Sequence, residues 1–265
     1  MAAAQVAPDV TRAPSTERLV AAVRDAAARG AQLVVLPELA PSGYCFLDRE
    51  EAWAAGELLD GASVTALRQV SLDRSVTVVA GLPLREGDTL FNAAVVLEDG
   101  EVLGVYRKSH LWAREKLLFT PGEQGPLVVT TRCGVLAVVV CYDLEFPEWV
   151  RVAAVAGAEL LCVPTNWPRG PRPAGERPME VLRAMVAAST NRMAIAVCDR
   201  CGDERGVTWV SGSAIASPDG WLLAGPPDEA APALLTADVD LAAARDKALG
   251  PRNDALADRR TALYG

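Results

Sequence analysis

The sequence predicts an α/β fold in which buried, mostly parallel strands alternate with helices. Short apolar runs of strand length recur between segments that have the 3.6-residue periodicity of helices. Turn signals such as Asp99-Gly100 and Asp219-Gly220 join other strands as antiparallel hairpins, so we expect mixed sheets. Since no composition break or linker divides the 265 residues, we expect a single domain, 1–265.

Each strand is predicted from a short apolar run, and each helix from an apolar stripe with a capping or terminating residue. Ser15 or Thr16, for example, can cap a helix that Gly30 ends. The first half of the chain is expected to contain, in order, a strand at Ala2–Val6, a helix to about Arg29, a strand at Gln32–Leu36, helices near 50–59 and 63–72, a strand at Val76–Leu82, a hairpin of Phe91–Leu97 with Val102–Arg107, and a long loop at His110–Pro126.

The second half continues the alternation. It is expected to contain a strand at Gly134–Val140, a helix that begins at Pro147, a strand at Leu160–Pro164, a helix at Met179–Asn191, a strand at Met193–Cys198, a hairpin of Ser211–Ser217 with Trp221–Ala224, a last strand at Leu234–Val239 and a short helix at Leu241–Leu249. The sequence has no phosphate-binding loop and neither a GxGxxG nor a GxSxG motif.

The prediction centres on the stretch from Cys133 to Glu159. Its apolar run ends at Cys141, and Pro147 with Glu148 then opens a helical pattern. Open α/β sheets place their ligand sites at the carboxyl ends of strands, which is where Cys141 lies. A nearby helix N-terminus would favour the thiolate form. Cys141 is therefore a candidate nucleophile, although most cysteines at strand ends are core residues.

Composition argues against several classes of protein. The formal net charge of -8 argues against a nucleic-acid partner, which would need a basic stripe. No apolar run approaches the roughly 18 residues of a membrane span. The first residues lack the pattern of a signal peptide, so we expect a cytoplasmic protein with free thiols. Cys198 and Cys201 form a CxxC, but a zinc site needs a second ligand pair, and two unrelated thiols are the better interpretation.

Three predicted strands end in groups that carry chemistry: Glu38, Lys108 and Cys141. If the strands are neighbours, the three groups can meet. A cysteine nucleophile needs a base, and His110 is the only histidine. A carboxylate such as Glu38 can take that role if burial raises its pKa, and Lys108 would then stabilise an oxyanion with the backbone N–H of Tyr142. Taken singly, Glu38 is also typical of a helix-cap partner, and Lys108 of a solvated edge charge.

Three segments, VVLPELAPSGY, VYRKSHLW and VVVCYDLEFPE, resemble the signatures of the nitrilase superfamily of carbon–nitrogen hydrolases, in the same order. The resemblance continues in LLCVPTNW, LRAMVAASTNRM and GSAIASPDG, and so covers nearly the whole chain. It implies a four-layer α-β-β-α sandwich of the nitrilase type with a Glu38–Lys108–Cys141 triad and no metal or cofactor. It also implies a homodimer or higher homo-oligomer that pairs across helices. Glu115 matches the family's frequent second glutamate, the alternative being an exposed loop charge.

The segment CYDLEFPE resembles the amidase-like branches of the superfamily. The expected reaction is hydrolysis of a small carboxamide through a thioester on Cys141. Tyr44, Tyr142, Asn166 and Trp167 are candidates to contact the substrate, and Trp167 is equally typical of a core or interface aromatic. The alternatives are an N-carbamoyl amidohydrolase or nitrilase, an acyltransferase that uses the same thioester, and, less favoured, a non-catalytic binding protein.

Two features depart from the family pattern. Glu145 stands where many relatives have arginine, so a local salt bridge is expected to be reversed or lost. The first strand is also shorter than usual. Neither departure touches the predicted triad.

Overall fold

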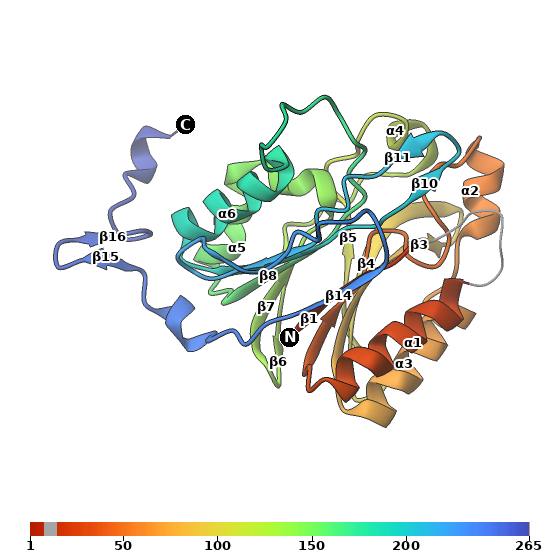
Figure 1. The fold of residues 1–265 in the computed structure, drawn as a ribbon, viewed down its shortest axis with the longest axis horizontal. Coiled ribbons are helices and arrows are strands. Elements are labelled where there is room, and N and C mark those ends of the chain that lie inside the picture. The colour runs from red at the N-terminus through yellow and green to blue at the C-terminus, as the bar shows by residue number, and fades with distance from the viewer. Residues whose placement is uncertain (8–14, 265) are drawn as a thin grey trace.

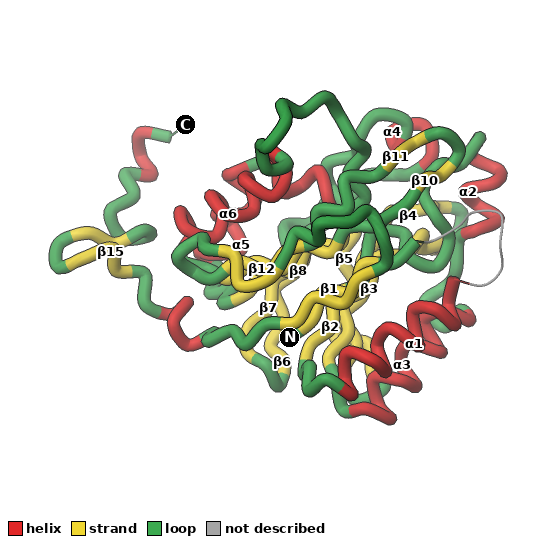
Figure 2. Tube along the Cα trace, viewed as in Figure 1, coloured by secondary structure: helices red, strands yellow, loops and turns green. Residues whose placement is uncertain are grey.

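The computed structural model describes residues 1–7 and 15–264, and its helices and strands alternate along the chain (Figures 1 and 2). The helices are α1 (Ser15–Ala28), α2 (Arg49–Ala55), α3 (Ala62–Arg74), α4 (Glu115–Leu118), α5 (Pro147–Val155) and α6 (Met179–Asn191), with short 3-10 turns η1 (Cys141–Glu145), η2 (Ala242–Arg245) and η3 (Thr261–Leu263). None of the helices among the described residues has the length and apolarity needed to cross a membrane.

The described strands form two six-stranded mixed sheets. The first has the order β14-β1-β2-β3-β4-β5 and consists of β1 (Ala2–Gln5), β2 (Leu33–Val35), β3 (Thr77–Glu86), β4 (Thr89–Glu98), β5 (Glu101–Arg107) and β14 (Ala233–Thr236). The second has the order β13-β12-β9-β8-β7-β6 and consists of β6 (Leu127–Thr131), β7 (Gly134–Val138), β8 (Leu160–Pro164), β9 (Ala194–Cys198), β12 (Ala214–Ala216) and β13 (Leu222–Ala224). Two small ribbons pair β10 (Asp203–Glu204) with β11 (Val207–Thr208), and β15 (Ala248–Gly250) with β16 (Asn253–Asp254).

Helices cover the outer face of each sheet. α1 and α3 lie against the first sheet, where Leu19, Val23 and Leu67 pack into one cluster with Val78 and Val95. α5 and α6 lie against the second sheet, on the opposite side of the molecule (Figure 1). The layers are therefore α-β-β-α, and the predicted fold class is confirmed.

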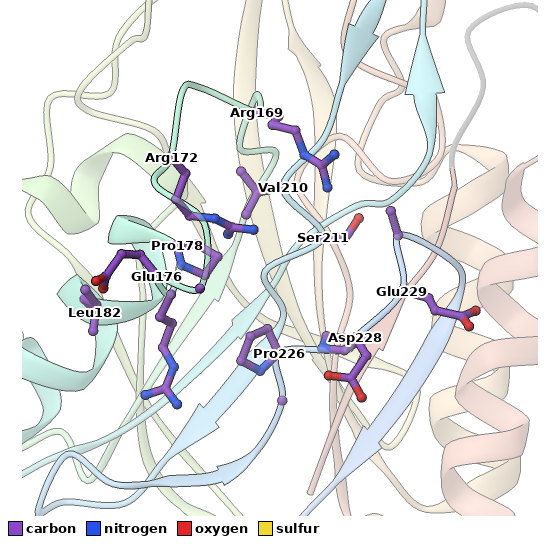
Figure 3. A pocket seen from close by; sticks show the side chains of 15 residues that line it. Arg169, Arg172, Glu176, Pro178, Leu182, Val210, Ser211, Pro226, Asp228 and Glu229 are labelled. Atoms are coloured by element: carbon purple, nitrogen blue, oxygen red, sulfur yellow. The ribbon is translucent and has the colours of Figure 1, made fainter.

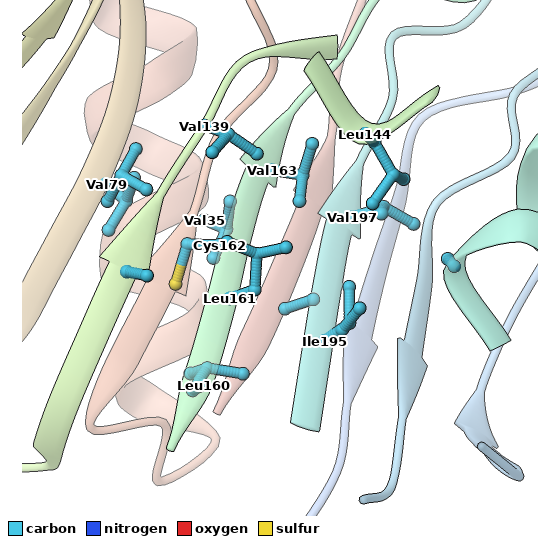
Figure 4. Packing of buried hydrophobic residues seen from close by; sticks show 14 of the residues in the cluster. Val35, Val79, Val139, Leu144, Leu160, Leu161, Cys162, Val163, Ile195 and Val197 are labelled. Atoms are coloured by element: carbon cyan, nitrogen blue, oxygen red, sulfur yellow. The ribbon is translucent and has the colours of Figure 1, made fainter. Parts of the chain in front are cut away.

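The inner faces of the two sheets form the central core (Figure 4). Val35 of β2 and Val79 of β3 belong to one buried cluster with Leu161, Cys162 and Val163 of β8, whose side chains alternate between the two faces of the second sheet. β8 contributes five consecutive fully buried residues, as expected for a parallel strand covered on both faces. With the sheets packed in this way, carboxyl ends of strands from both sheets lie side by side at one edge of the sandwich.

Some elements differ from the sequence prediction. The helix expected at Leu241–Leu249 is wrong: only the turn η2 forms, and β15 follows, so the expected last strand is not the last either. The side chain of Lys247 donates to the carbonyls of Asn191 and Arg192, at 3.2 and 2.8 Å, and so ties this segment to the end of α6. β6, which pairs antiparallel with β7, was not predicted.

Candidate active site

Side chains that carry chemistry meet where parallel strands of both sheets end. Glu38 follows β2 and Lys108 follows β5 of the first sheet, while Cys141 follows β7 of the second. The Glu38 N–H donates to the carbonyl of Thr165 at 3.4 Å, and Asn166 donates from Nδ2 to the Glu38 carbonyl at 2.9 Å. Thr165 and Asn166 follow β8 of the second sheet. The site therefore lies on the seam, the line along which the two sheets meet at this edge.

A glycine allows the Glu38 turn to lie close against β3. A Cβ atom at Gly81 would be 2.5 Å from the Glu38 Cα and 2.7 Å from the Pro37 carbonyl oxygen. The Gly81 N–H donates to that carbonyl at 3.1 Å, and the Ala40 N–H donates to the Gly81 carbonyl at 2.9 Å. Leu39 adopts the left-handed φ of 47°. Gly81 thus fixes the backbone from which the Glu38 side chain projects.

Lys108 forms a buried cluster with two carboxylates. Its Nζ lies 2.7 Å from Oε1 of Glu38 and 2.8 Å from Oε1 of Glu115, and the three side chains are 0–2% exposed. Burial raises the pKa of Glu38 to about 7, although the Lys108 charge opposes the shift. Burial alone would lower the pKa of Lys108, but Glu115 and Glu38 raise it well above its usual value. The ammonium therefore keeps its charge, and Glu38 titrates near neutrality.

The two oxygens of Glu38 have different surroundings. Oε1 accepts from Asn92 Nδ2 at 2.6 Å as well as from Lys108. Oε2 is buried and has no hydrogen-bond partner within the part of the chain that the structure describes. Oε2 is therefore the oxygen that is free to take a proton. Sequence reasoning missed Asn92, whose signal is a lone amide inside the apolar run of β4.

Cys141 has a strained backbone and a protonated thiol. It begins η1 with a left-handed φ of 50°, which is unfavourable for any residue with a Cβ, and it is only 6% exposed. The sulfur donates to the Asn166 carbonyl at 3.8 Å. Burial, and then the charge of Glu38, raises the pKa of the Cys141 thiol well above its usual value. The expectation that a helix N-terminus favours the thiolate is therefore wrong, because α5 begins only at Pro147 and burial dominates.

Asp143 ties the Cys141 turn to the end of β5. Its buried carboxylate accepts from the Val140 N–H at 2.9 Å and from the Tyr106 hydroxyl at 2.8 Å. It also accepts from the His110 N–H at 3.0 Å and lies 2.7 Å from Nδ1 of the His110 ring. These contacts and a stack on Phe146 account for the position of His110, whose Nδ1 faces Asp143. Asp143 was not singled out from the sequence, and its only signal is a polar residue two positions after the nucleophile.

Glu145, the residue that departs from the family pattern, forms an ion pair. Its Oε1 lies 3.0 Å from Nη1 of Arg183 on α6, and both side chains are about one-third exposed (31% and 36%). A salt bridge therefore exists at this position, with Glu145 as its acidic partner.

The predicted pocket residues lie in different settings. The Tyr44 hydroxyl donates to Oε1 of Glu115 at 2.6 Å, and Asn166 contacts both Glu38 and Cys141. The Tyr142 ring packs edge-on against Trp112, with centroids 4.7 Å apart. Trp167 is 5% exposed, and its backbone N–H donates to Oδ1 of Asp199 at 3.0 Å. The structure thus brings Tyr44 and Asn166 to the charged cluster, whereas Trp167 has the burial of a core residue.

A cavity of about 760 Å³ lies outside this cluster (Figure 3). It is lined by residues of the loops 169–178, 210–211 and 225–230, and by Leu182. The four residues Glu38, Lys108, Glu115 and Cys141 are not part of its wall.

The CxxC cysteines, Cys198 and Cys201, are buried near the end of β9. The described residues include no group of three or more His, Cys, Asp or Glu that could hold a metal.

Comparison with known proteins identifies the family. The sequence profile of carbon-nitrogen hydrolases matches residues 1–248. The chain belongs to the carbon-nitrogen hydrolase family. This hydrolase is 37% identical over 245 residues to a nitrilase of Pyrococcus abyssi, covering 91% of this chain and 89% of that protein. The resemblance to the nitrilase superfamily is confirmed, and the protein is a hydrolase that acts on carbon–nitrogen bonds other than peptide bonds.

Solved structures of similar sequence are amidases. One is a variant of the amidase from Nesterenkonia sp. AN1 with the acetamide moiety of fluoroacetamide added covalently at its active-site cysteine; it is 31% identical to this hydrolase, with a TM-score of 0.76 over 99% of this chain and 94% of that chain. Another variant of that amidase holds butyramide, with 30% identity, a TM-score of 0.76 and the same coverage of 99% and 94%. At this identity the likeness covers sequence and fold together.

Proposed function

We propose that the protein is a cysteine-dependent amidase that hydrolyses a small carboxamide to a carboxylate and ammonia. The observation that carries the proposal is the buried cluster of Glu38, Lys108 and Glu115 beside the Cys141 thiol. Burying charges costs stability unless they are paired, and such clusters with shifted pKa values are typical of functional sites. The cysteine adduct and the butyramide complex of the Nesterenkonia amidase support the same chemistry.

In the first half-reaction Glu38 acts as general base. Because the thiol of Cys141 holds its proton, a base must remove that proton as the sulfur attacks. Oε2 of Glu38 takes the proton, the sulfur bonds to the amide carbon, and the carbonyl electron pair moves onto oxygen. The Lys108 ammonium and the backbone N–H of Tyr142 stabilise this oxyanion. The C–N bond then breaks, and Glu38 returns the proton to nitrogen, so that ammonia leaves and a thioester remains.

In the second half-reaction Glu38 takes a proton from water, and the resulting hydroxide adds to the thioester carbon. The new oxyanion contacts the same two donors, the Lys108 ammonium and the Tyr142 N–H. As the C–S bond breaks, the Cys141 sulfur regains a proton from Glu38, and the carboxylic acid is released. Protons and electrons balance over the cycle without a further reactant.

The other predicted residues support this cycle. Glu115 keeps Lys108 charged and in place through its 2.8 Å contact. We propose that Tyr44, Tyr142, Asn166 and Trp167 border the substrate, with the Asn166 carbonyl orienting the thiol. We also propose that residues 1–265 act as one domain, since the triad draws on both sheets.

A screen of ammonia release over short aliphatic, aromatic and carbamoyl amides, and over nitriles, tests the proposal. We expect turnover of at least one small amide, and an acyl adduct on Cys141 in the intact mass after a rapid quench. Cys141→Ala should show neither. An adduct on another cysteine, or preference for a nitrile, would contradict the proposal. Products with added amines or alcohols would reveal acyl transfer instead of hydrolysis.

A further inference from the structure

A hairpin far along the chain buries a second ion pair. β10 and β11 are joined by Arg205 and Gly206, whose φ values of 47° and 84° suit a tight hairpin turn. Glu204 of this hairpin pairs with Arg200, and both side chains are at most 4% exposed. The desolvation cost of a buried ion pair is offset only if further hydrogen bonds satisfy the remaining polar atoms of the two side chains. The remaining partners of Glu204 therefore indicate what the pair holds in place.

Those partners are backbone groups of the loop that carries Tyr44. The Tyr44 N–H donates to both carboxylate oxygens of Glu204, at 2.9 and 3.1 Å. The Cys45 N–H donates to one of them at 3.1 Å. Hydrogen bonds to a charged acceptor are stronger than those between neutral groups. Glu204 thus fixes the backbone of Tyr44, a residue 160 positions earlier in the chain.

The same segment also holds the Tyr44 ring. The ring meets Trp209 edge to face, with centroids 5.5 Å apart and an interplanar angle of 82°. The Arg200 guanidinium lies 4.6 Å from the centroid of the Trp209 ring. Residues 200–209 therefore contact Tyr44 at its main chain and at its side chain.

The held side chain reaches the charged cluster of the site. The Tyr44 hydroxyl donates at 2.6 Å to Oε1 of Glu115. This is the same oxygen that accepts from Lys108 Nζ at 2.8 Å. A continuous series of contacts thus runs from Glu204 through Tyr44 and Glu115 to the ammonium.

We propose that Glu204 is a positioning residue, which holds Tyr44 so that its hydroxyl keeps Glu115 aimed at Lys108. The inference rests on the proposed amidase reaction, in which Lys108 stabilises the oxyanion. Loss of the Glu204 charge releases the Tyr44 loop, and Lys108 then keeps its contact with Glu38 but loses a fixed contact with Glu115. Because the interaction between the Lys108 ammonium and the oxyanion strengthens in the transition state, kcat falls while KM changes little.

A double-mutant cycle tests this with Glu204→Gln, Tyr44→Phe and the combined variant, assayed on a small amide such as butyramide. We expect each single change to lower kcat by about tenfold, the usual effect of losing an outer partner of a site. The combined variant should be no slower than the slower single variant, because both changes break one series of contacts. Additive losses, or wild-type kcat in Glu204→Gln beside a slow Tyr44→Phe, would overturn the proposal.

Glu159→Gln is the matched control. Glu159 is likewise buried, accepts a backbone N–H from Val135 at 3.0 Å and pairs with Arg245, but it lies at the opposite end of β8. We expect near wild-type kcat for it. If Glu204→Gln fails to fold by circular dichroism, Glu204→Asp keeps the charge but shortens the reach, and the same cycle applies.

A readout without turnover separates this inference from the proposed function. The Lys108 charge favours the thiolate form of Cys141, which is the form that iodoacetamide alkylates. The rate of this alkylation, followed on the peptide that carries Cys141, should therefore fall about tenfold in Glu204→Gln and in Tyr44→Phe. If the wild-type protein releases no ammonia from any amide, the proposed function fails, but the alkylation rates still report whether Glu204 acts on the cluster. Unchanged alkylation in Glu204→Gln would overturn the positioning role.

Discussion

Lys108 contacts the carboxylates of Glu38 and Glu115 at once, at 2.7 and 2.8 Å, while fully buried. Two carboxylates beside one ammonium carry one excess negative charge. Burial disfavours this charge and raises the pKa of Glu38 to about 7, so that Glu38 can hold a proton near neutral pH. The same three groups thus supply a charged donor that stays protonated and a carboxyl group that can exchange a proton. At the scale of single residues, the proposed function depends on this difference between Lys108, which stays charged, and Glu38, which gains and loses a proton.

Lys108→Arg separates charge from geometry. The guanidinium keeps the positive charge but is larger and planar, and it favours fork-like pairing over the compact contact that an ammonium makes. We expect turnover to fall by about two to three orders of magnitude, comparable to the loss of an oxyanion donor. Steady-state kinetics on folded protein measures this. Near wild-type turnover in Lys108→Arg, beside an inactive Cys141→Ala, would limit the site to Glu38 and Cys141.

The pH dependence of kcat/KM should report Glu38. The base must be ionised in the free enzyme, and its pKa is raised to about 7, so the rate should fall about tenfold per pH unit as the pH drops below 7. His110 is the only histidine of the chain, and histidine is the usual base for a cysteine nucleophile. The acidic limb should therefore persist in His110→Asn; if it vanishes there, the limb belongs to the histidine.

At the scale of elements, the strands and helices could be predicted where a residue pattern is continuous. β8 and α6 have the predicted bounds, because an unbroken apolar run and a regular helical stripe define them. β6 was missed because its apolar run, residues 127–129, is only three residues long, and two threonines follow it. The sequence signals of Asn92 and Asp143 do not reveal their roles, because their partners Glu38 and Tyr106 are distant in sequence and meet them only in the fold.

Gly81→Ala tests how an element holds the site. The added Cβ would lie 2.5 Å from the Glu38 Cα, closer than such contacts allow, so the Glu38 turn must move away from β3. We expect a loss of about 1–3 kcal/mol in the free energy of unfolding, the usual cost of overpacking, and a larger fractional loss of turnover.

Gly170→Ala is the control for that change, because nothing lies within 4 Å of the added atom. Chemical denaturation and kinetics of both variants give the comparison. Equal activity in the two would show that the contact between β3 and the Glu38 turn does not set the geometry of the base.

At the scale of the whole molecule, the helices of the second sheet carry exposed valines. Val152 and Val155 of α5 and Val186 of α6 are 50%, 52% and 60% exposed on the helical layer of the second sheet. The chain after η2 runs outward past this layer (Figure 1), where Arg151 holds it through the Ala255 carbonyl at 3.0 Å. We therefore predict that the homodimer implied by the sequence resemblance forms through this helical layer.

Val152→Asp combined with Val186→Asp tests the dimer. A charge at each position would face its own image or another apolar side chain across the interface, and neither can be buried unpaired without a large cost. We expect light scattering to give a dimer or larger assembly for the wild type and a monomer for the variant. A monomeric wild type would contradict the prediction, and an unchanged mass in the variant would place the interface on another face.

The position of Glu38 and Cys141 on opposite sides of the seam has a consequence for refolding. Each sheet with its helices forms one half of the molecule, and neither half holds both the base and the nucleophile, because Glu38 follows a strand of the first sheet and Cys141 a strand of the second. Activity can return only after the two halves have docked in register, so its recovery times the final assembly step, whereas circular dichroism follows the earlier ones. A substrate analogue that contacts both sides would act as a clamp, slowing the separation of the halves and raising the temperature at which they part.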